Sequence, residues 1–344
     1  MATFIGIDYP TWWFLLVGAA FSGYVILDGF DLGAGALHLF FKKDLSRRIA
    51  LNAVGPVWDG NEVWLVIGGG TLFAGFPVLY GTLLSAMYLP FMLFLLFIIL
   101  RSVAIEFRSK EPMAWWRSLW DVTYSVSSSM LAVCLGIVLG NVLQGMPLDA
   151  NYEYTGNWLS FFNFYAILTG LTTLALMALH GGIYLTLKTE GKLFEKVEGL
   201  LKYAVVAFVV LFMVLSIYTL IYYPHLSDKF KNTPIFFVAP LLAVLSIANI
   251  PRLISKRKFL PAFAFSSLTF ALLLIIVAIE VYPQLIYATN DVNHSITIYN
   301  AASSDKSLGI MLTIAAIGLP LIAGYTFFVY RAFWGKVKID ETSY

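Results

Sequence analysis

The sequence predicts an all-α polytopic membrane protein that crosses the bilayer nine times. Of its 344 residues, 60% are apolar and only 12% are charged, whereas a soluble domain is nearer half apolar and about a quarter charged. Apolar stretches of about 20 residues, the length that a helix needs to cross the hydrocarbon core, recur along the whole chain. Basic residues gather in alternate connections between these stretches. We therefore expect a single integral-membrane domain over residues 1–344.

Nine apolar segments predict the membrane helices, at roughly 11–40, 52–75, 77–107, 118–144, 161–187, 197–222, 234–253, 259–285 and 307–333. Several are longer than a straight crossing needs, so they should tilt or project beyond the lipid. Phe76-Pro77 ends the second helix on a tight turn, and Asn232-Thr233-Pro234 predicts a cap followed by a proline in the first turn. The connections are short, so no separate soluble module is expected.

The basic residues predict the orientation of the chain. Of the 22 lysines and arginines, 19 fall on one side of the predicted membrane, and the other side has only Lys229, Lys231 and Lys306. Because cytoplasmic loops carry the excess of basic residues, the richer side is expected to be cytoplasmic. This places the N-terminus outside and the C-terminus inside.

Composition also excludes several classes of function. The net charge of +2 is too small to indicate a nucleic-acid partner. The single cysteine, Cys134, allows neither an intrachain disulfide nor a cysteine metal cluster. The first apolar stretch lacks a basic segment before it and is too long for a cleavable signal peptide.

Four carboxylates lie inside the first two predicted helices. Asp28 with Asp31, and Asp59 with Glu62, are spaced i, i+3, so each pair presents both carboxyls on one helix face. Ionisable groups at membrane depth are costly and usually face a protein interior or a water path. Counting along the helices puts both pairs in the cytoplasmic part of the membrane. The third helix brings Arg101 and Glu106 to a similar depth.

Two interpretations of this cluster remain open. In the first, the carboxylates relay protons from the cytoplasm, since each can gain and lose one; Asp28 and Asp59 are the leading candidates, followed by Asp31, Glu62 and Glu106. In the second, Arg101 pairs with one acid and the others cap helix ends. Asp121, at the start of the fourth helix, is expected to be a simple interfacial charge.

Other side chains are expected to support this cluster. Trp58 and Trp64 flank the second acid pair and are better explained by packing within the protein than by anchoring at the interface. Glycines accompany the acids on the first two helices, which predicts that these helices approach closely. His180 lies within the membrane and is expected to be a hydrogen-bonded core histidine. No two histidines share a helix at ligand spacing, so no metal-binding, haem-binding or catalytic residue is predicted.

The motifs around the acids resemble those of a known family. Asp28-Gly-Phe-Asp31-Leu-Gly33 and Pro56-Val-Trp58-Asp59-Gly60-Asn61-Glu62-Val-Trp64-Leu65 are similar to segments of subunit II of the cytochrome bd-type quinol oxidases. Further similarities run through Phe107-Arg108-Ser109-Lys110, Trp120-Asp121, Gly140-Asn141-Val-Leu143-Gln144-Gly145 and Phe265-Ser266-Ser267-Leu268-Thr269. Nearly all of the chain is covered, and the first two motifs are long and specific.

The resemblance implies a multi-pass protein of a bacterial or archaeal cytoplasmic membrane. It implies two four-helix bundles plus one peripheral helix, with the first bundle at about 1–150 and the remainder at 151–344. The expected partner is subunit I, in a pseudo-symmetric heterodimer. That subunit carries haems b558, b595 and d, oxidises quinol near the outer face and reduces dioxygen to water.

The resemblance also implies roles for residues of this chain. Subunit II binds no haem, and acids matching Asp28, Asp31 and Asp59 line a hydrophilic route for cytoplasmic protons. Asn61 belongs to the second motif and is taken as a supporting residue. A small single-helix accessory subunit, bound lipid and a structural quinone are compatible with this assignment. The alternative is a stand-alone ion-coupled transporter, which the absence of paired, broken helices in the two halves disfavours.

Overall fold

The computed structural model describes residues 3–339, and nearly all of this part is helical. The helices are α1 (Tyr9–Leu37), α2 (Asp44–Val54), α3 (Trp58–Gly75), α4 (Pro77–Ala86), α5 (Tyr88–Phe107), α6 (Ala114–Gln144), α7 (Phe164–Lys188), α8 (Gly191–Tyr222), α9 (Asp228–Asn232), α10 (Val238–Ser255), α11 (Phe259–Val281) and α12 (Asp305–Ala332). Two small hairpins, β1 (Thr3–Phe4) with β2 (Ile7–Asp8) and β3 (Gln284–Ile286) with β4 (Ile296–Thr297), lie at one end.

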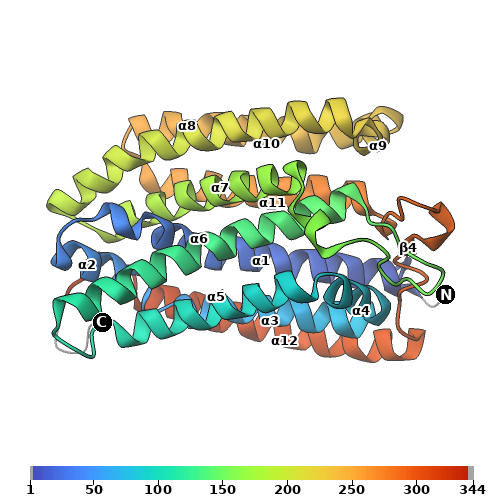
Figure 1. Cartoon of the computed structure of the whole chain (residues 1–344), viewed down its shortest axis with the longest axis horizontal. Helices are drawn as coiled ribbons and strands as arrows, with labels where there is room; N and C mark the ends of the chain where they lie inside the picture. The colour runs from blue at the N-terminus through green and yellow to red at the C-terminus, as the bar shows by residue number, and fades with distance from the viewer. Residues whose placement is uncertain (1–2, 340–344) are drawn as a thin grey trace.

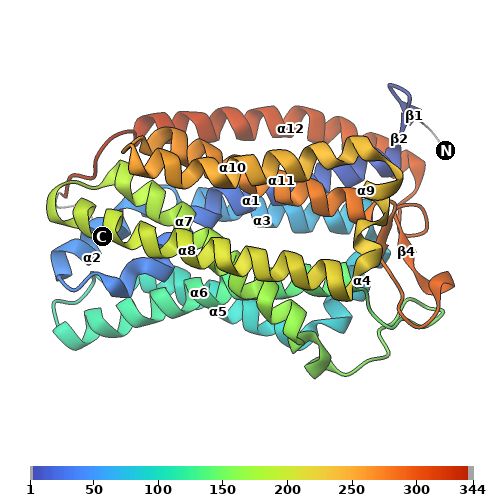
Figure 2. The ribbon, with the colours of Figure 1, turned by 90° about the horizontal axis from the view of Figure 1, so that it is seen from above.

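The long helices run side by side along the longest axis of the molecule (Figures 1 and 2). Eight helices of the described chain are each long and apolar enough to cross a membrane, or nine when α3 and α4 are counted together as one span bent by 118°. The fold class predicted from the sequence, a polytopic all-α membrane protein, is therefore confirmed.

Two of the predicted helices are each interrupted near a proline. The segment predicted at 52–75 is split into the end of α2 and the start of α3, with Pro56 between them. The segment predicted at 77–107 is split at Met87 into α4 and α5. Pro90 explains the second break, because a proline ring clashes with the carbonyl four residues before it, here that of Ala86.

Helix α1 lies at the centre of the fold and packs against α3, α6, α7 and α11. The main apolar core joins Leu32 of α1 and Leu131 of α6 with Met177 of α7 and Phe270 of α11, so it is shared by both halves of the chain. In contrast, α8 and α12 bury little of their surface within this chain. Their exposed apolar faces are suited to lipid or to a partner subunit.

Helices α1 and α7 pack closely at two glycines. A Cβ atom on Gly33 would lie only 1.8 Å from the carbonyl oxygen of Met177, and one on Gly181 would lie 2.4 Å from the backbone nitrogen of Ala34. By contrast, a Cβ on Gly60 or Gly70 of α3 would meet nothing within 4 Å. A Cβ on Gly68 of α3, however, would lie 2.9 Å from the ring of Phe21 on α1. The expected close approach of α1 and α3 is therefore found at Gly68 and not at Gly60 or Gly70.

Candidate functional site

The first acid pair lies on α1, and both carboxylates are completely buried. Asp28 forms a bidentate ion pair with Arg101 of α5: Nη2 donates to Oδ1 at 2.6 Å, and Nη1 donates to Oδ2 at 3.1 Å. Arg101 is itself only 1% exposed. Each charge compensates the other at a depth where a lone charge is costly. This contact belongs to the second interpretation of the acids, in which Arg101 pairs with one of them.

Asp31 has a different environment, although it lies one turn away. Its Oδ2 accepts a hydrogen bond from Asn61 Nδ2 of α3 at 2.7 Å. Its Oδ1 is buried and has no hydrogen-bond partner among residues 3–339. Asn61 also donates to the carbonyl of Leu27 at 3.1 Å and accepts from the hydroxyl of Tyr330 at 2.8 Å. Asn61 thus connects Asp31 of α1 to Tyr330 of α12 by hydrogen bonds, in keeping with the supporting role predicted for it. Sequence reasoning did not include Tyr330 in this cluster.

The second acid pair lies at the start of α3 and is divided between two environments. Asp59 is exposed on the surface of this chain, whereas Glu62 is half-buried. Glu62 Oε1 is buried without a hydrogen-bond partner in the described chain, and Glu62 lies within electrostatic range of Arg101, Asp28 and Asp59. Glu62 therefore lies between the buried cluster and the exposed carboxylate. Glu106 is half-buried near the end of α5.

The two predicted supporting tryptophans are packed within the protein. Trp58 is 7% exposed and shares an apolar cluster with Ala104, Ile105 and Tyr124. Trp64 covers Gly23 of α1, where a Cβ would lie 2.5 Å from its ring. These contacts fix the start of α3 against α5, α6 and α1.

His180 belongs to a separate contact on the opposite side of α1. Its Nδ1 lies 2.6 Å from Ser266 Oγ, and its Nε2 lies 3.0 Å from the carbonyl of Ile26. The ring stacks on Phe263 at 4.5 Å between centroids. Both ring nitrogens are therefore held by protein partners, in the manner of a hydrogen-bonded core histidine that ties α1 to α7 and α11.

A second charged network lies at the end of α1 where the chain turns into α2. Asp121 of α6 is 1% exposed, and its carboxylate is bonded by His38 Nε2 at 2.6 Å, Arg108 Nε at 2.6 Å and Arg47 Nη1 at 3.0 Å. The expectation of a simple interfacial charge at Asp121 is therefore wrong. The carboxylate is covered because three basic side chains, brought from α1, α2 and the end of α5, enclose it.

The electrostatics of this network keep Arg108 charged. Burial lowers the pKa of Arg108, but hydrogen bonds and charge from Asp121 and Asp44 outweigh burial and raise it above its usual value. Arg108 Nη2 donates to Asp44 Oδ1 at 2.8 Å, and the Asp44 side chain is 52% exposed. The network therefore extends from a buried histidine to the solvent.

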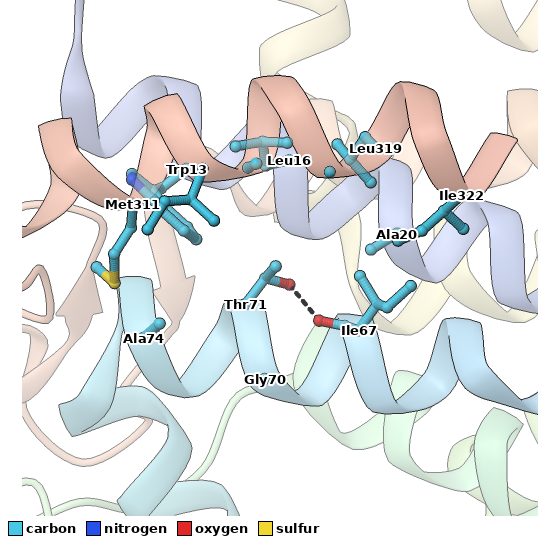
Figure 3. Close-up of a pocket in the computed structure, with 13 residues that line it drawn as sticks. Trp13, Leu16, Ala20, Ile67, Gly70, Thr71, Ala74, Met311, Leu319 and Ile322 are labelled. Carbon is cyan, nitrogen blue, oxygen red and sulfur yellow. Dashed lines mark hydrogen bonds between the residues drawn. The ribbon is translucent and has the colours of Figure 1, made fainter. Parts of the chain in front are cut away.

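An apolar groove lies on the other end of α1, between α1, α3 and α12 (Figure 3). It encloses about 290 Å³, and its lining is almost entirely hydrocarbon. The Thr71 hydroxyl is bonded to the carbonyls of Ile67 and Gly68, and the Trp13 indole N–H donates to the carbonyl of Leu308. The groove can therefore hold an acyl or isoprenoid chain, but these two polar groups are already occupied.

Fold and site together define a class: a polytopic α-helical membrane protein with a buried ion pair and carboxylates gathered on α1, α3 and α5. The chain belongs to the cytochrome bd terminal oxidase subunit II family, whose model matches residues 9–333. The resemblance found in the sequence motifs is thereby confirmed.

Individual relatives agree over the full length. The chain is 33% identical to the cytochrome bd ubiquinol oxidase subunit 2 of Bacillus subtilis (strain 168) over 338 residues, covering 96% of this chain and 97% of that protein. It is 30% identical to the cytochrome bd-I ubiquinol oxidase subunit 2 of Escherichia coli (strain K12) over 372 residues, covering 97% of each. A chain of the solved bd oxidase from Geobacillus thermodenitrificans has the same fold, with a TM-score of 0.77, 19% identity, and coverage of 94% of this chain and 98% of that one.

Proposed function

We propose that this chain is the haem-free subunit II of a bd-type quinol oxidase and that it conducts protons from the cytoplasm toward the haems of subunit I. The complex oxidises quinol and reduces dioxygen to water at haems b558, b595 and d of the partner, and this chain alone is not catalytic. Family membership and full-length relatives named as subunit 2 support the pairing. We propose a pseudo-symmetric heterodimer, in which each subunit has two four-helix bundles and one peripheral helix.

The environment of the buried His180 supports a haem-free subunit. His180 has both ring nitrogens held by Ser266 and the Ile26 carbonyl, and His38 uses Nε2 to bind Asp121. A haem ligand must present a ring nitrogen to iron, so His180 would have to give up a contact within the core.

Asp31 carries the proposal of a proton path. One of its oxygens is fixed by Asn61, and the other is buried without a protein partner. A carboxyl in this setting can take up a proton or release one without breaking an ion pair. Asp28 differs, because protonating it would break the bidentate contact with Arg101. We therefore assign Asp31 as the exchanging group and Asp28 as the fixed anion that balances Arg101.

The second pair gives the path a direction. Glu62 lies within electrostatic range of both the Arg101–Asp28 pair and Asp59, and Asp59 is exposed on the outer surface of α3. A carboxylate on a membrane-facing surface is costly unless another protein covers it. We propose that Asp59 faces subunit I and passes the proton across the interface.

Orientation and location follow from the charge distribution. The excess of basic residues on one side supports a cytoplasmic C-terminus and an external N-terminus in a bacterial or archaeal cytoplasmic membrane. Protons drawn from the cytoplasm make the oxygen reaction electrogenic. A stand-alone transporter is not favoured, because the matched family and the full-length relatives are oxidase subunits.

The test uses Asp31→Asn and Asp59→Asn in the assembled complex. Both changes keep the side-chain size and remove the exchangeable proton. We therefore expect oxygen consumption per haem to fall by at least about tenfold, a limit set below the hundredfold or more typical for loss of a general acid–base group. The haem absorption spectrum should stay normal. Glu195→Gln, at an exposed position of α8, is the matched control and should keep full turnover. Normal turnover in both Asp variants would refute the relay, and loss of haem in both would indicate a structural role.

A further inference from the structure

The two charged networks of this chain are linked by one stripe of small and polar residues. Asp28, Asp31 and Gly35 of α1 and His38, which caps the end of α1 in a helical conformation, are spaced by three, four and three residues, so they share a helix face. His38 contacts Asp121 of α6, and a Cβ on Gly35 would lie 2.2 Å from Ser128 Oγ. The stripe therefore runs along the contact between α1 and α6, from the buried carboxylates to the network that reaches solvent.

The facing stripe on α6 is formed by Asp121, Tyr124 and Ser128. The Tyr124 ring stands edge-on to the His38 ring, with 5.1 Å between centroids and an angle of 86°. Tyr124 also lies within electrostatic range of Arg101 and Asp31. It is therefore placed between the two networks.

Hydrogen-bonding atoms along this seam are buried and have no partner among residues 3–339. They are Asp31 Oδ1, His38 Nδ1, Arg101 Nε, Tyr124 Oη and Ser128 Oγ. The residues that carry them are each no more than 2% exposed. Buried polar atoms in native proteins are almost always bonded to protein or to ordered water. A cluster of five therefore calls for an explanation.

Neighbouring hydroxyls on the same helix show that the seam is unusual. Ser127 Oγ donates to the carbonyl of Thr123, and Ser129 Oγ donates to the carbonyl of Ser125. These are the ordinary contacts of serine within a helix. Ser128 lies between them in sequence but makes no such bond. Its hydroxyl points instead toward α1, where it occupies the space that a side chain at Gly35 would need.

We propose that ordered water molecules occupy the α1–α6 seam and join Asp31 to His38 through the hydroxyls of Tyr124 and Ser128. A buried water makes about three hydrogen bonds to polar groups that the protein leaves unpaired. Water can donate to Asp31 Oδ1 and can both donate to and accept from the two hydroxyls. With Nε2–H donated to Asp121, Nδ1 of a neutral His38 is an acceptor, which water also satisfies.

This inference rests on the proposed proton path and identifies where protons reach it. A proton leaves Nδ1 of a charged His38, passes along the water molecules and ends on Asp31 Oδ1, so His38 becomes neutral and Asp31 becomes protonated. Asp121 holds the ring in place and stabilises its charged form. Asp44 is half-exposed and brings the cytoplasmic end of the network to solvent. Arg108 keeps its protons throughout, so His38 takes up its next proton on Nδ1 from water of the seam. Tyr124 and Ser128 are positioning residues, because they act on the water.

The test removes the two hydroxyls with little change in shape, using Tyr124→Phe and Ser128→Ala in the assembled complex. We expect oxygen consumption per haem to fall by about threefold to tenfold, as for loss of one hydrogen bond in the path, with a normal haem spectrum. Ser127→Ala is the matched control, because its hydroxyl bonds its own helix, and it should keep full turnover. The solvent isotope effect on turnover should rise in the two seam variants and not in the control, which a purely structural role would not produce.

A high-resolution structure of the wild-type complex gives a second measurement that does not depend on the variants folding. We expect ordered water within hydrogen-bond distance of Asp31 Oδ1 and of the Tyr124 or Ser128 hydroxyl. A seam without water, or full turnover in both seam variants, would overturn the inference. If Asp31→Asn still lowers turnover in that case, the proton path stands and protons reach it elsewhere; if Asp31→Asn is also without effect, the proposed function fails as well.

Discussion

The ion pair between Arg101 and Asp28 should dominate the stability of the carboxylate cluster. In an Arg101→Met variant, Asp28 is left without its bidentate partner, and the Asp28 side chain is 0% exposed. Breaking a buried pair by removing one partner typically costs about 3–5 kcal/mol. Since each 1.4 kcal/mol is a factor of ten in an equilibrium constant, the ratio of folded to unfolded protein should fall by roughly a hundredfold to a few thousandfold.

A double variant distinguishes the cost of the uncompensated charge from the cost of lost packing. Asp28→Asn in the Arg101→Met background removes the uncompensated charge, and replacing both partners of a buried pair by neutral groups of similar volume is often close to neutral. We therefore expect the double variant to recover much of the stability that the single variant loses. Thermal unfolding of the purified complex and the amount of assembled complex in membranes measure both. Wild-type stability in Arg101→Met, or no recovery in the double variant, would refute the assignment of Asp28 as a fixed anion.

Three further predictions follow from single contacts. Tyr330→Phe removes the hydrogen bond to Asn61 Oδ1 and should lower the free energy of unfolding by about 0.5–1.5 kcal/mol. Thermal unfolding measures the change, and Tyr325→Phe, at an exposed tyrosine of the same helix, is the control. Equal stability of the two variants would contradict the prediction. Gly33→Ala should prevent assembly because its Cβ would collide with the Met177 carbonyl, whereas the control Gly70→Ala should be tolerated. Immunodetection of the complex in membranes compares the two variants. Normal assembly of Gly33→Ala would show that α1 and α7 can separate. Asp121→Asn leaves Arg108 and Arg47 without their shared carboxylate and should destabilise the complex by about 3–5 kcal/mol, measured by chemical unfolding; a change under about 1 kcal/mol would mean that solvent already compensates these charges.

The spans could be predicted from sequence because the length and apolar character of a membrane helix are local properties. The breaks at Pro56 and Met87 were also encoded locally, but continuous apolar runs concealed them. Proline in a membrane helix is tolerated when its neighbours satisfy the freed backbone groups, so the presence of Pro90 did not by itself require a break.

The candidate site was predictable as a group of acids and not as a set of contacts. The spacing of Asp59 and Glu62 predicts that they share a face, but the rotation of α3 about its axis decides which carboxylate is buried. That rotation is set by tertiary contacts such as Trp64 over Gly23, which pair distant parts of the sequence.

The contacts that sequence reasoning missed join residues that are far apart in the sequence. His38 and Asp121 are 83 residues apart, and Asn61 and Tyr330 are 269 residues apart. Each of these residues has an ordinary explanation when considered alone, as a helix-end charge or an aromatic residue at the interface. Their roles depend on which helix faces which, and short-range periodicity does not specify that.

Proton uptake by the complex during a single turnover tests the central claim most directly. The fully reduced complex is mixed with oxygen in the presence of a pH-sensitive dye, and haem oxidation and proton uptake are followed together. For Asp31→Asn we predict that oxygen binds and the first electron transfer to it proceeds at the wild-type rate. Proton uptake should slow by at least about tenfold, a limit set below the hundredfold or more typical for loss of an acid–base group. Proton uptake as fast in Asp31→Asn as in the wild-type complex would contradict a path through this carboxylate.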